Sequence, residues 1–349
     1  MIDDKHHSLP IIGRRGFLQT MGASLAAVLA SPRFAKAALP PQVNVAFFLS
    51  TSPFMIAKGE GWVQDLAKTK VNWIEVSSGA EINTGVAAGS IDVGYGIGSS
   101  PTAAGIAQGI PYEVVAMMDN IGPAEEMTVR KSANIKTPAD FKGKKVATPF
   151  GSTSHFRLLG FLKTNNLTER DVTVLDLRGD ALVAAWTRGD IDAGYIWSPA
   201  KSKLLENGGE VYKTYDKLEA AGYVIADVII SRTALNAASP ELVAAMLAAY
   251  GRSLDMYTAK VDESSALVGK YAGVTAAVAK ADMAEYDFIA LKQQLTPAWL
   301  GEPGKPGKFA KVMKDTADFL VAQKSIRSSP DLAVFEKAIN TSLLAKAIG

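Results

Sequence analysis

The sequence predicts an α/β fold of two lobes, each built around a β-sheet with helices packed against it. Strand-like and helical patterns alternate along most of the chain, which is typical of βα units. The length of 349 residues exceeds that of one ordinary domain, for which about 100–200 residues is usual. A seven-residue pattern also occurs twice, as expected if a similar element is used in each lobe.

The strands and helices follow from the spacing of apolar residues. Residues 43–49 are a continuous apolar run, as in a buried strand, whereas 71–76 alternate in polarity, as in a half-buried one. We predict strands at 43–49, 71–76, 144–148 and 172–177, and helices at 156–165 and 182–187. This order indicates mainly parallel sheets. From about residue 240 the chain is rich in Ala, Leu and Lys and is predicted to be helical.

The repeated pattern reads Gly-Ser-Ile-Asp-Val-Gly-Tyr at 89–95 and Gly-Asp-Ile-Asp-Ala-Gly-Tyr at 189–195. A Ser-Pro pair follows each copy, at 100–101 and 198–199. One interpretation is a helix–strand–loop element used once in each lobe; the other is a common helix-to-strand turn. If the first holds, the loops after both strands face the cleft between the lobes, because α/β sheets bind ligands at strand carboxyl ends.

Charge and composition exclude several classes of function. The net charge is +2, but residues 1–37 hold five basic and two acidic side chains, so the rest of the chain is almost neutral. Such a body has no strong field to attract nucleic acid or an anionic membrane. There is no cysteine, and His155 is the one histidine after residue 37, which rules out thiolate chemistry and multi-histidine metal sites. We therefore expect no metal, no cofactor and no nucleic-acid partner.

Residues 1–37 are predicted to be a signal peptide. An arginine pair at 14–15 precedes a short apolar run at 21–30 and an Ala-Lys-Ala cleavage signal at 35–37. The run is too short for a membrane span, which needs about 20 residues. The arginine pair resembles a twin-arginine signal, with the general secretion route as the alternative. We expect cleavage near Ala37 and a mature protein outside the cytoplasm; the competing interpretation is a buried helix with solvated arginines.

Two serine-rich turns each lie between a predicted strand and a predicted helix. The first contains Ser99 and Ser100, with Ser100 expected to cap the helix, and the second contains Ser152, Thr153 and Ser154. Unpaired backbone N–H groups and the helix dipole attract anions at such positions. Ordinary helix capping explains each turn taken alone. One turn in each lobe, however, suggests an anion clamp across the cleft.

Three further residues are candidates for binding a positively charged group. Glu125 precedes an apolar strand, and Asp227 lies inside the apolar run 224–230, where an unpaired charge is costly. Trp197 follows the second copy of the repeat and could offer its ring face to an ammonium group. The alternatives are salt bridges for the two acids and core packing for the tryptophan.

Taken together, these segments resemble the taurine-binding group within the family of nitrate, sulfonate and thiamine-precursor binding proteins. The likeness runs from Val43 to about Leu320. The stretches that carry it are 87–92, 98–101, 149–156, 184–192, 195–199, Asp227 and 295–297. The sequence departs from the family pattern at 50–54, which leaves the exact ligand open.

The resemblance implies a type II periplasmic-binding-protein-like fold, with a central mixed β-sheet in each lobe and two hinge crossovers. The first lobe would comprise 38–125 and 228–349, and the second 126–227. A sulfonate would be held by Ser99 and Ser100 from one lobe and by Ser152, Thr153 and Ser154 from the other. The amine end of the ligand would meet Glu125, Trp197 and Asp227.

The implied function is capture of taurine or a related small sulfonate in the periplasm, by a monomer that delivers it to the permease and ATPase subunits of an ABC importer. Another alkanesulfonate, a nitrate-like anion or a pyrimidine precursor remains an alternative ligand, and a sensor is an alternative role. A hydrolase using His155 with Ser152 or Ser154 is disfavoured, because these residues share one turn and no G-x-S-x-G elbow is present. Enzymes of this fold that make the thiamine pyrimidine need lysine and cysteine features that are absent or cannot be placed here.

Overall fold

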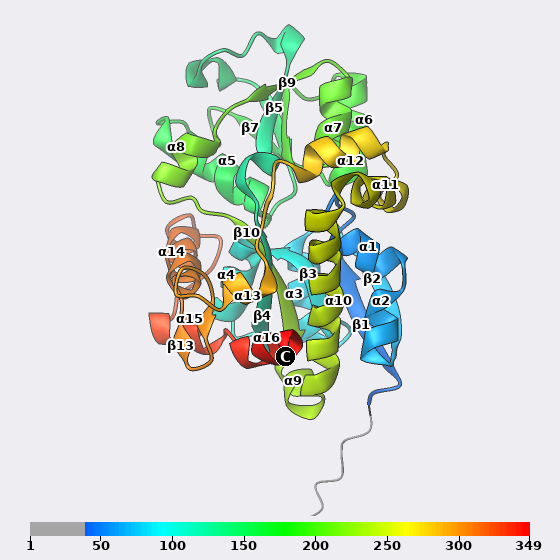
Figure 1. The fold of residues 1–349 in the computed structure, drawn as a ribbon. Coiled ribbons are helices and arrows are strands. Elements are labelled where there is room, and N and C mark those ends of the chain that lie inside the picture. The colour runs from blue at the N-terminus through cyan, green and yellow to red at the C-terminus, as the bar shows by residue number, and fades with distance from the viewer. Residues whose placement is uncertain (1–38) are drawn as a thin grey trace, which may run out of the picture. The chain divides into compact units, whose positions relative to one another are not determined.

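The computed structural model describes residues 39–349, and the predicted signal peptide and its cleavage site lie outside them. Two β-sheets with surrounding helices make up this part of the chain (Figure 1). We call the six-stranded sheet with its helices the first lobe, and the five-stranded sheet with its helices the second lobe. The four strands predicted at 43–49, 71–76, 144–148 and 172–177 are found at 42–47, 70–75, 145–148 and 173–176.

The first lobe holds a mixed sheet in the order β11-β4-β10-β3-β1-β2. Its strands are β1 (Gln42–Phe47), β2 (Lys70–Glu75), β3 (Val93–Gly98), β4 (Tyr112–Asn120), β10 (Ala226–Arg232) and β11 (Asp287–Phe288). β1 pairs in parallel with β2 and β3, whereas β10 is antiparallel to both β3 and β4. The sheet is therefore parallel on one side and antiparallel on the other.

The second lobe repeats this plan in the order β7-β6-β8-β5-β9. Its strands are β5 (Glu126–Arg130), β6 (Lys145–Thr148), β7 (Thr173–Asp176), β8 (Ala193–Ile196) and β9 (Gly209–Tyr212). β6 is parallel to β7 and β8, and β5 is antiparallel to β8 and β9. Both sheets thus have the parallel core that the alternation of strands and helices predicts, extended by antiparallel strands into a mixed sheet.

Helices surround both sheets, and the C-terminal third is mostly helical, as predicted. The α-helices are α1 (Phe54–Gly59), α2 (Trp62–Ala67), α3 (Gly79–Ala87), α4 (Ser99–Ala107), α5 (Thr153–Thr164), α6 (Gly179–Arg188), α7 (Ala200–Glu206), α8 (Tyr215–Ala220), α9 (Thr233–Ala238), α10 (Pro240–Ala259), α11 (Val261–Ala272), α12 (Ala276–Met283), α13 (Leu291–Gln294), α14 (Phe309–Ala322), α15 (Leu332–Lys337) and α16 (Thr341–Ile348). Short 3-10 helices lie at Gly122–Ala124, Lys131–Ala133 and Pro138–Phe141, and β12 (Gly301–Glu302) and β13 (Lys305–Pro306) form a small hairpin. Among residues 39–349, no helix combines the length and apolar character needed to cross a membrane.

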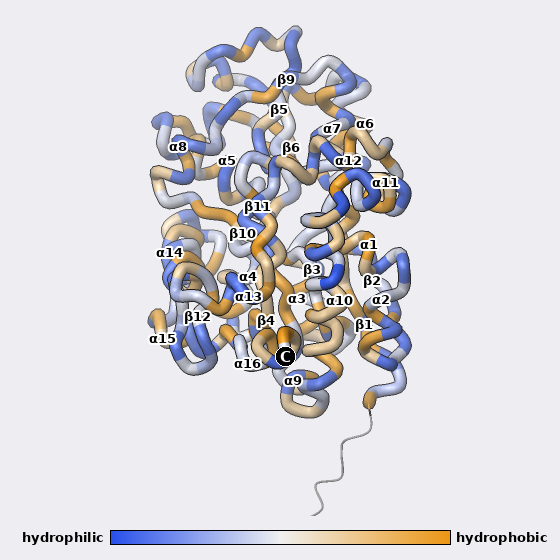
Figure 2. The backbone as a smooth tube through the Cα atoms, viewed as in Figure 1, coloured by the Kyte–Doolittle hydropathy of each residue, from blue (hydrophilic) through white to orange (hydrophobic). Residues whose placement is uncertain are grey.

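Each lobe has its own apolar core, which explains why the chain folds around two sheets. The larger core includes the inner faces of β1, β3, β4 and β10, and a second core lies around β5, β6 and β8. Figure 2 shows apolar residues concentrated along the central strands of the first lobe. α10 is held against this sheet, since the Tyr95 hydroxyl donates a 3.0 Å hydrogen bond to the Met246 carbonyl.

The chain crosses between the two sheets twice, once from β4 to β5 and once from β9 and α8 back to β10 (Figure 1). The predicted second lobe ended at residue 227, but Ala226 and Asp227 already belong to β10 of the first sheet. The return to the first lobe is therefore two residues earlier than predicted, because the register with β4 begins at Ala226. The other predicted boundaries remain predictions.

The two copies of the sequence repeat have the same local structure. In each, a glycine in the left-handed conformation follows within two residues of the helix end, Gly89 with φ of +73° and Gly189 with φ of +79°, and the next strand begins four residues later. In the first copy, Asp92 Oδ2 accepts a 2.9 Å hydrogen bond from the Asn44 N–H; in the second, Asp192 Oδ2 accepts one of 2.9 Å from the Lys145 N–H. The repeat therefore ties a helix–strand connection to the start of the neighbouring parallel strand in both lobes.

Candidate functional site

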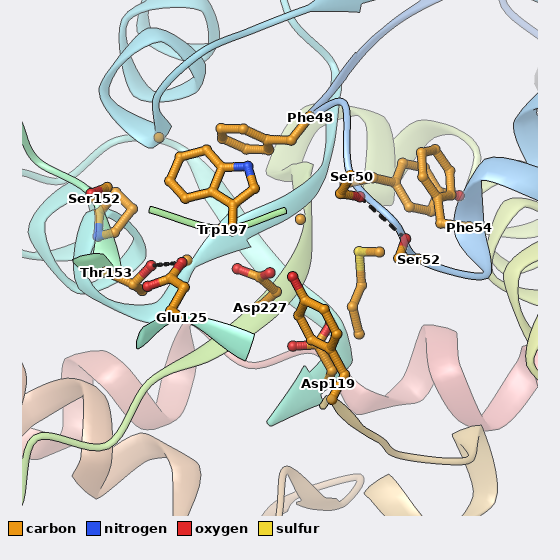
Figure 3. Close-up of a pocket in the computed structure, with 17 residues that line it drawn as sticks. Phe48, Ser50, Ser52, Phe54, Asp119, Glu125, Ser152, Thr153, Trp197 and Asp227 are labelled. Carbon is orange, nitrogen blue, oxygen red and sulfur yellow. Dashed lines mark hydrogen bonds between the residues drawn. The ribbon is translucent and has the colours of Figure 1, made fainter. Parts of the chain in front are cut away.

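A cavity of about 40 Å³ lies between the lobes, at the carboxyl ends of the parallel strands (Figure 3). Loops after β1, β3, β6 and β8 contribute to its wall, together with the beginning of β10. A single water molecule needs a cavity volume of at least about 10–15 Å³. The volume found here is a few times larger, so the cavity suits a small ligand. Three carboxylates line it, and the lining residues include no lysine, arginine or histidine.

Five of the eight predicted site residues line this cavity. They are Glu125, Ser152, Thr153, Trp197 and Asp227. In the sequence they are spread over about one hundred residues, and folding brings them together from both lobes and a crossover. Figure 3 shows the carboxylates of Glu125 and Asp227 on one side of the Trp197 ring.

The other three predicted residues are close by but do not line the cavity. Ser99 Oγ accepts a 3.3 Å hydrogen bond from the Ala226 N–H, and Ser100 Oγ donates a 3.1 Å hydrogen bond to the Ser152 carbonyl. Ser154 is fully buried, and its hydroxyl has no hydrogen-bond partner among the described residues. The hydroxyls of Ser99 and Ser100 therefore interact with other protein groups, and Ser100 joins the two lobes.

The helix caps differ from the prediction in the first lobe and agree with it in the second. α4 begins at Ser99 with Gly98 as its cap, so the expectation that Ser100 caps this helix is wrong; its hydroxyl crosses to the second lobe instead. Ser152 does cap α5, accepting a 3.1 Å hydrogen bond from the His155 N–H. The two helix amino ends lie very close to each other. If Gly98 carried a side chain, its Cβ would be 2.5 Å from Thr153 Cγ2, which is too short for a van der Waals contact.

The three carboxylates belong to Asp119, Glu125 and Asp227. Asp119 lies near the end of β4 and is the register partner of Asp227 in β10, while Glu125 lies in the crossover just before β5. Asp119 and Glu125 are 1% and 3% exposed. The Thr153 hydroxyl donates a 2.7 Å hydrogen bond to Glu125 Oε1. The other carboxylate oxygen of Glu125 is buried without a protein partner, and so is Oδ1 of Asp119.

Burial and mutual repulsion disfavour negative charge on this cluster. Burial raises the pKa of Asp119 and Asp227 well above the usual range, and the nearby Glu125 charge raises both further. Burial also raises the pKa of Glu125, opposed by the hydrogen bond from Thr153, by the nearby Ser154 hydroxyl and by the charge of Arg157. Unpaired buried carboxylate oxygens are costly, so this cluster is arranged to receive a hydrogen-bond donor, above all a cationic one.

The candidate hydrolase site is not assembled. His155 Nδ1 accepts a 3.3 Å hydrogen bond from the Gly151 N–H, and the imidazole stacks on Phe150 with ring centroids 4.4 Å apart. The Ser152 hydroxyl donates to the Pro149 carbonyl at 2.7 Å. Burial lowers the pKa of His155 to about 4. The serine proton is thus directed to a carbonyl oxygen, and the imidazole lies outside the cavity lining.

Known proteins match the chain over most of its length. The sequence pattern of the NMT1/THI5-like family covers residues 50–264. The chain belongs to this family. It is 30% identical over 290 residues to the taurine-binding periplasmic protein of Escherichia coli K12, covering 81% of this chain and 87% of that one. It is also 25% identical over 313 residues to a putative aliphatic sulfonates-binding protein of Bacillus subtilis 168, covering 88% of each.

Solved structures of this family's fold resemble the chain as well. The alkanesulfonate-binding protein SsuA from Xanthomonas axonopodis pv. citri, bound to MOPS, superposes with a TM-score of 0.73 at 24% identity, covering 87% of this chain and 99% of that one. The desulfurization enzyme DSZB superposes with a TM-score of 0.62 at 14% identity, covering 88% and 99%. The two-lobed periplasmic-binding-protein-like fold that the sequence predicts is thereby confirmed.

Several cavity residues of this NMT1/THI5-like protein were not predicted from its sequence. Asp119 is an acid at the end of the apolar run 114–118, still inside β4, and could have been found by the argument that singled out Asp227. Phe48 and Tyr286 gave no such signal, since each is one aromatic residue in an apolar or mixed segment. Ser50 and Ser52, in the stretch where the chain departs from the family pattern, also line the cavity.

Proposed function

We propose that this protein is a periplasmic solute-binding protein that captures taurine or a related small sulfonate for an ABC importer. The observation that carries the proposal is the make-up of the cavity wall: two helix amino ends with hydroxyl groups and three carboxylates line the same small space, with Asp119 and Glu125 buried and Asp227 half-buried. A small zwitterion with an anionic head and an ammonium tail complements both kinds of group. The names of the two relatives, one for taurine and one for aliphatic sulfonates, agree with this chemistry.

The anionic head would bind at the amino end of α5, near Ser152 and Thr153. Backbone N–H groups in the first turn of a helix have no partner within the helix, and the helix dipole adds about 0.3–1 kcal/mol for an anion there. α4 begins on the opposite side of the cleft, so two helix dipoles would point toward the same group. A sulfonate has three acceptor oxygens and can use donors from both helices.

The ammonium tail would bind among Asp119, Glu125 and Asp227. It offers N–H donors to the carboxylate oxygens that have no protein partner. Its charge would offset the repulsion between the acids and draw their pKa values back down. Trp197 would add a cation–π contact with its ring face, as Figure 3 shows the ring next to Glu125 and Asp227.

Binding would occur with the lobes apart and would be completed when they close about the two crossovers. Contacts between the lobes are present here, including the hydrogen bond from Ser100 to Ser152 and the edge-to-face contact of Phe48 with Trp197. Low-micromolar affinity corresponds to about −8 kcal/mol, which a few charge-assisted hydrogen bonds and one aromatic contact can provide.

The remaining parts of the proposal concern the cellular setting. The protein would be exported by its twin-arginine or general secretion signal, be cleaved near Ala37, and act as a monomer. Its partners would be the permease and ATPase subunits of a taurine-type importer, and it would have no enzymatic activity of its own. Genes for a permease and an ATPase beside this one would favour import over sensing.

Isothermal titration calorimetry on the mature protein tests the ligand class. Taurine is expected to bind in the low-micromolar range, more tightly than ethanesulfonate, which lacks the ammonium group, and more tightly than ethylamine, which lacks the sulfonate. Nitrate and a pyrimidine serve as probes for the alternative ligands. If a single-charge ligand binds as tightly as taurine, the two-ended site is wrong.

A further inference from the structure

The ligand cavity is separated from a second cavity by two aromatic rings. We infer that Phe48 and Trp197 form a partition that sets the maximum length of the ligand, so that a two-carbon amino-sulfonate fits while longer or nitrogen-substituted sulfonates are excluded. This inference rests on the proposed function. It assigns a role in ligand specificity to Phe48, a residue that the sequence patterns did not single out.

The lining of the two cavities carries the argument. The inner cavity, of about 40 Å³, holds the three carboxylates; the outer one, of about 110 Å³, lies on the other side of the ring pair. Phe48 and Trp197 are the two residues that line both. Their rings meet edge to face at an interplanar angle of 87°, with centroids 5.8 Å apart, which is contact distance for aromatic rings.

The partition is formed across the cleft, one ring from each lobe. Phe48 directly follows β1 of the first lobe, and Trp197 directly follows β8 of the second. Figure 3 shows the Phe48 ring against the outer side of Trp197, with Glu125 and Asp227 beyond the opposite side of the indole. Lobe closure thus brings the two rings together and shuts the inner cavity against the outer one.

The outer cavity has a different chemical character from the inner one. Side chains of both signs line it: Glu75 from the end of β2, Asp180 from α6 and Lys203 from α7. A longer ligand that passed between the rings would find space and mixed polar partners there. The partition, rather than a lack of space in the cleft, therefore limits ligand length.

The test compares two sulfonates with and without the partition. Taurine is the short probe, and MOPS, whose nitrogen is enclosed in a morpholine ring, is the long one. Calorimetry should give tight binding of taurine and much weaker binding of MOPS to the unaltered protein. In Phe48→Ala the ratio of the MOPS dissociation constant to that of taurine should fall at least about tenfold, since one misfitting methylene already changes affinity by about 10- to 200-fold.

Leu49→Ala is the matched control. Leu49 is the next residue in the sequence and is also partly buried, but it lines only the outer cavity and not the inner one. It should leave the ratio unchanged. Phe48→Leu, a milder truncation, keeps the test valid if Phe48→Ala does not fold, and should lower the ratio by less. Thermal unfolding checks that each variant is folded.

The outcomes separate the two proposals. A folded Phe48 variant that binds taurine with an unchanged ratio overturns the partition and leaves the proposed function intact. Failure of the unaltered protein to bind any sulfonate overturns the proposed function, and the partition with it. A lowered ratio in both Phe48 variants and an unchanged one in Leu49→Ala supports the partition.

Discussion

The two copies of the repeat make the same scaffold but present different groups to the cleft. After β3, Gly98 leads directly into α4, so a helix amino end with little side chain faces the cavity. After β8, Trp197 enters the cavity before α7 begins at Ala200. The hydrogen bonds of the repeat keep the strands in place, and the residues just beyond them are free to differ. Scaffold and ligand chemistry are thus encoded by neighbouring but separate residues.

The antiparallel strand beside each repeat also combines a shared scaffold with a different group facing the cleft. β10 follows α8 and carries Asp227 at its second residue; β5 begins one residue after Glu125. Both acids therefore lie where a crossover enters a sheet, at the hinge between the lobes. The first lobe adds Asp119 and so holds more of the carboxyl groups, whereas the second adds the hydroxyls of Ser152 and Thr153.

Replacing Asp227 by alanine should have the largest effect. Removing one partner of a buried charged contact costs about 2–5 kcal/mol, so calorimetry should show at least about a 30-fold loss of taurine affinity. Ethanesulfonate, which has no ammonium group, should lose much less. Asp216→Ala, at an exposed position in α8, serves as the control and should bind both ligands normally. Equal losses for the two ligands would mean that Asp227 has a structural role instead.

The repeat aspartates allow a direct comparison of stability between lobes. Asp92→Ala and Asp192→Ala each leave a backbone N–H without its acceptor, which costs about 1–3 kcal/mol. The loss should be larger for Asp92, because its other oxygen accepts a 2.6 Å hydrogen bond from Arg232. Urea unfolding measures both. If Asp192→Ala lowered the free energy of unfolding more than Asp92→Ala, the extra bond from Arg232 would not make the first copy of the repeat the more strongly held one.

The carboxylate cluster should make the ligand-free protein less stable as the pH rises. The pKa values of Asp119, Glu125 and Asp227 are raised in the folded state, so above about pH 4 the folded protein binds more protons than the unfolded chain. The free energy of unfolding therefore falls as the pH rises from that value through the folded-state pKa values. Asp119→Asn should weaken this dependence and raise stability at neutral pH. Denaturant unfolding of the ligand-free protein at several pH values measures this dependence. If the free energy of unfolding changed with pH equally in the unaltered protein and in Asp119→Asn, Asp119 would not contribute to it.

Ser100→Ala should have the smallest effect. Loss of its hydrogen bond to the Ser152 carbonyl costs about 0.5–1.5 kcal/mol of stability, and taurine affinity should change little because the hydroxyl does not line the cavity. Thr153→Val, which removes a hydroxyl in the cavity wall, should weaken taurine binding clearly more. Equal effects on the dissociation constant would indicate that Ser100 reaches the ligand after all.

Local sequence patterns are enough to predict several strands and helices of this protein and five residues that line its candidate site. The strand predicted at 43–49 is β1 at Gln42–Phe47, and the helix predicted at 156–165 overlaps α5. The repeat, capping by the turn that contains Ser152, and the choice of Asp227 and Trp197 as candidates followed from local patterns. Apolar spacing, helix capping and the cost of an acid in an apolar run depend on neighbouring residues alone, so one sequence is enough to recognise them.

Tertiary structure alone decided which groups meet in the cavity. Asp119 enters the carboxylate cluster because β4 and β10 pair in the register that places it opposite Asp227. Ser100 turns away from the cavity because α5 brings the Ser152 carbonyl within reach, and Phe48 meets Trp197 because two lobes converge. These contacts join residues that are 52 to about 150 positions apart. Pairing register and lobe approach are properties of the whole chain, and no local pattern encodes them.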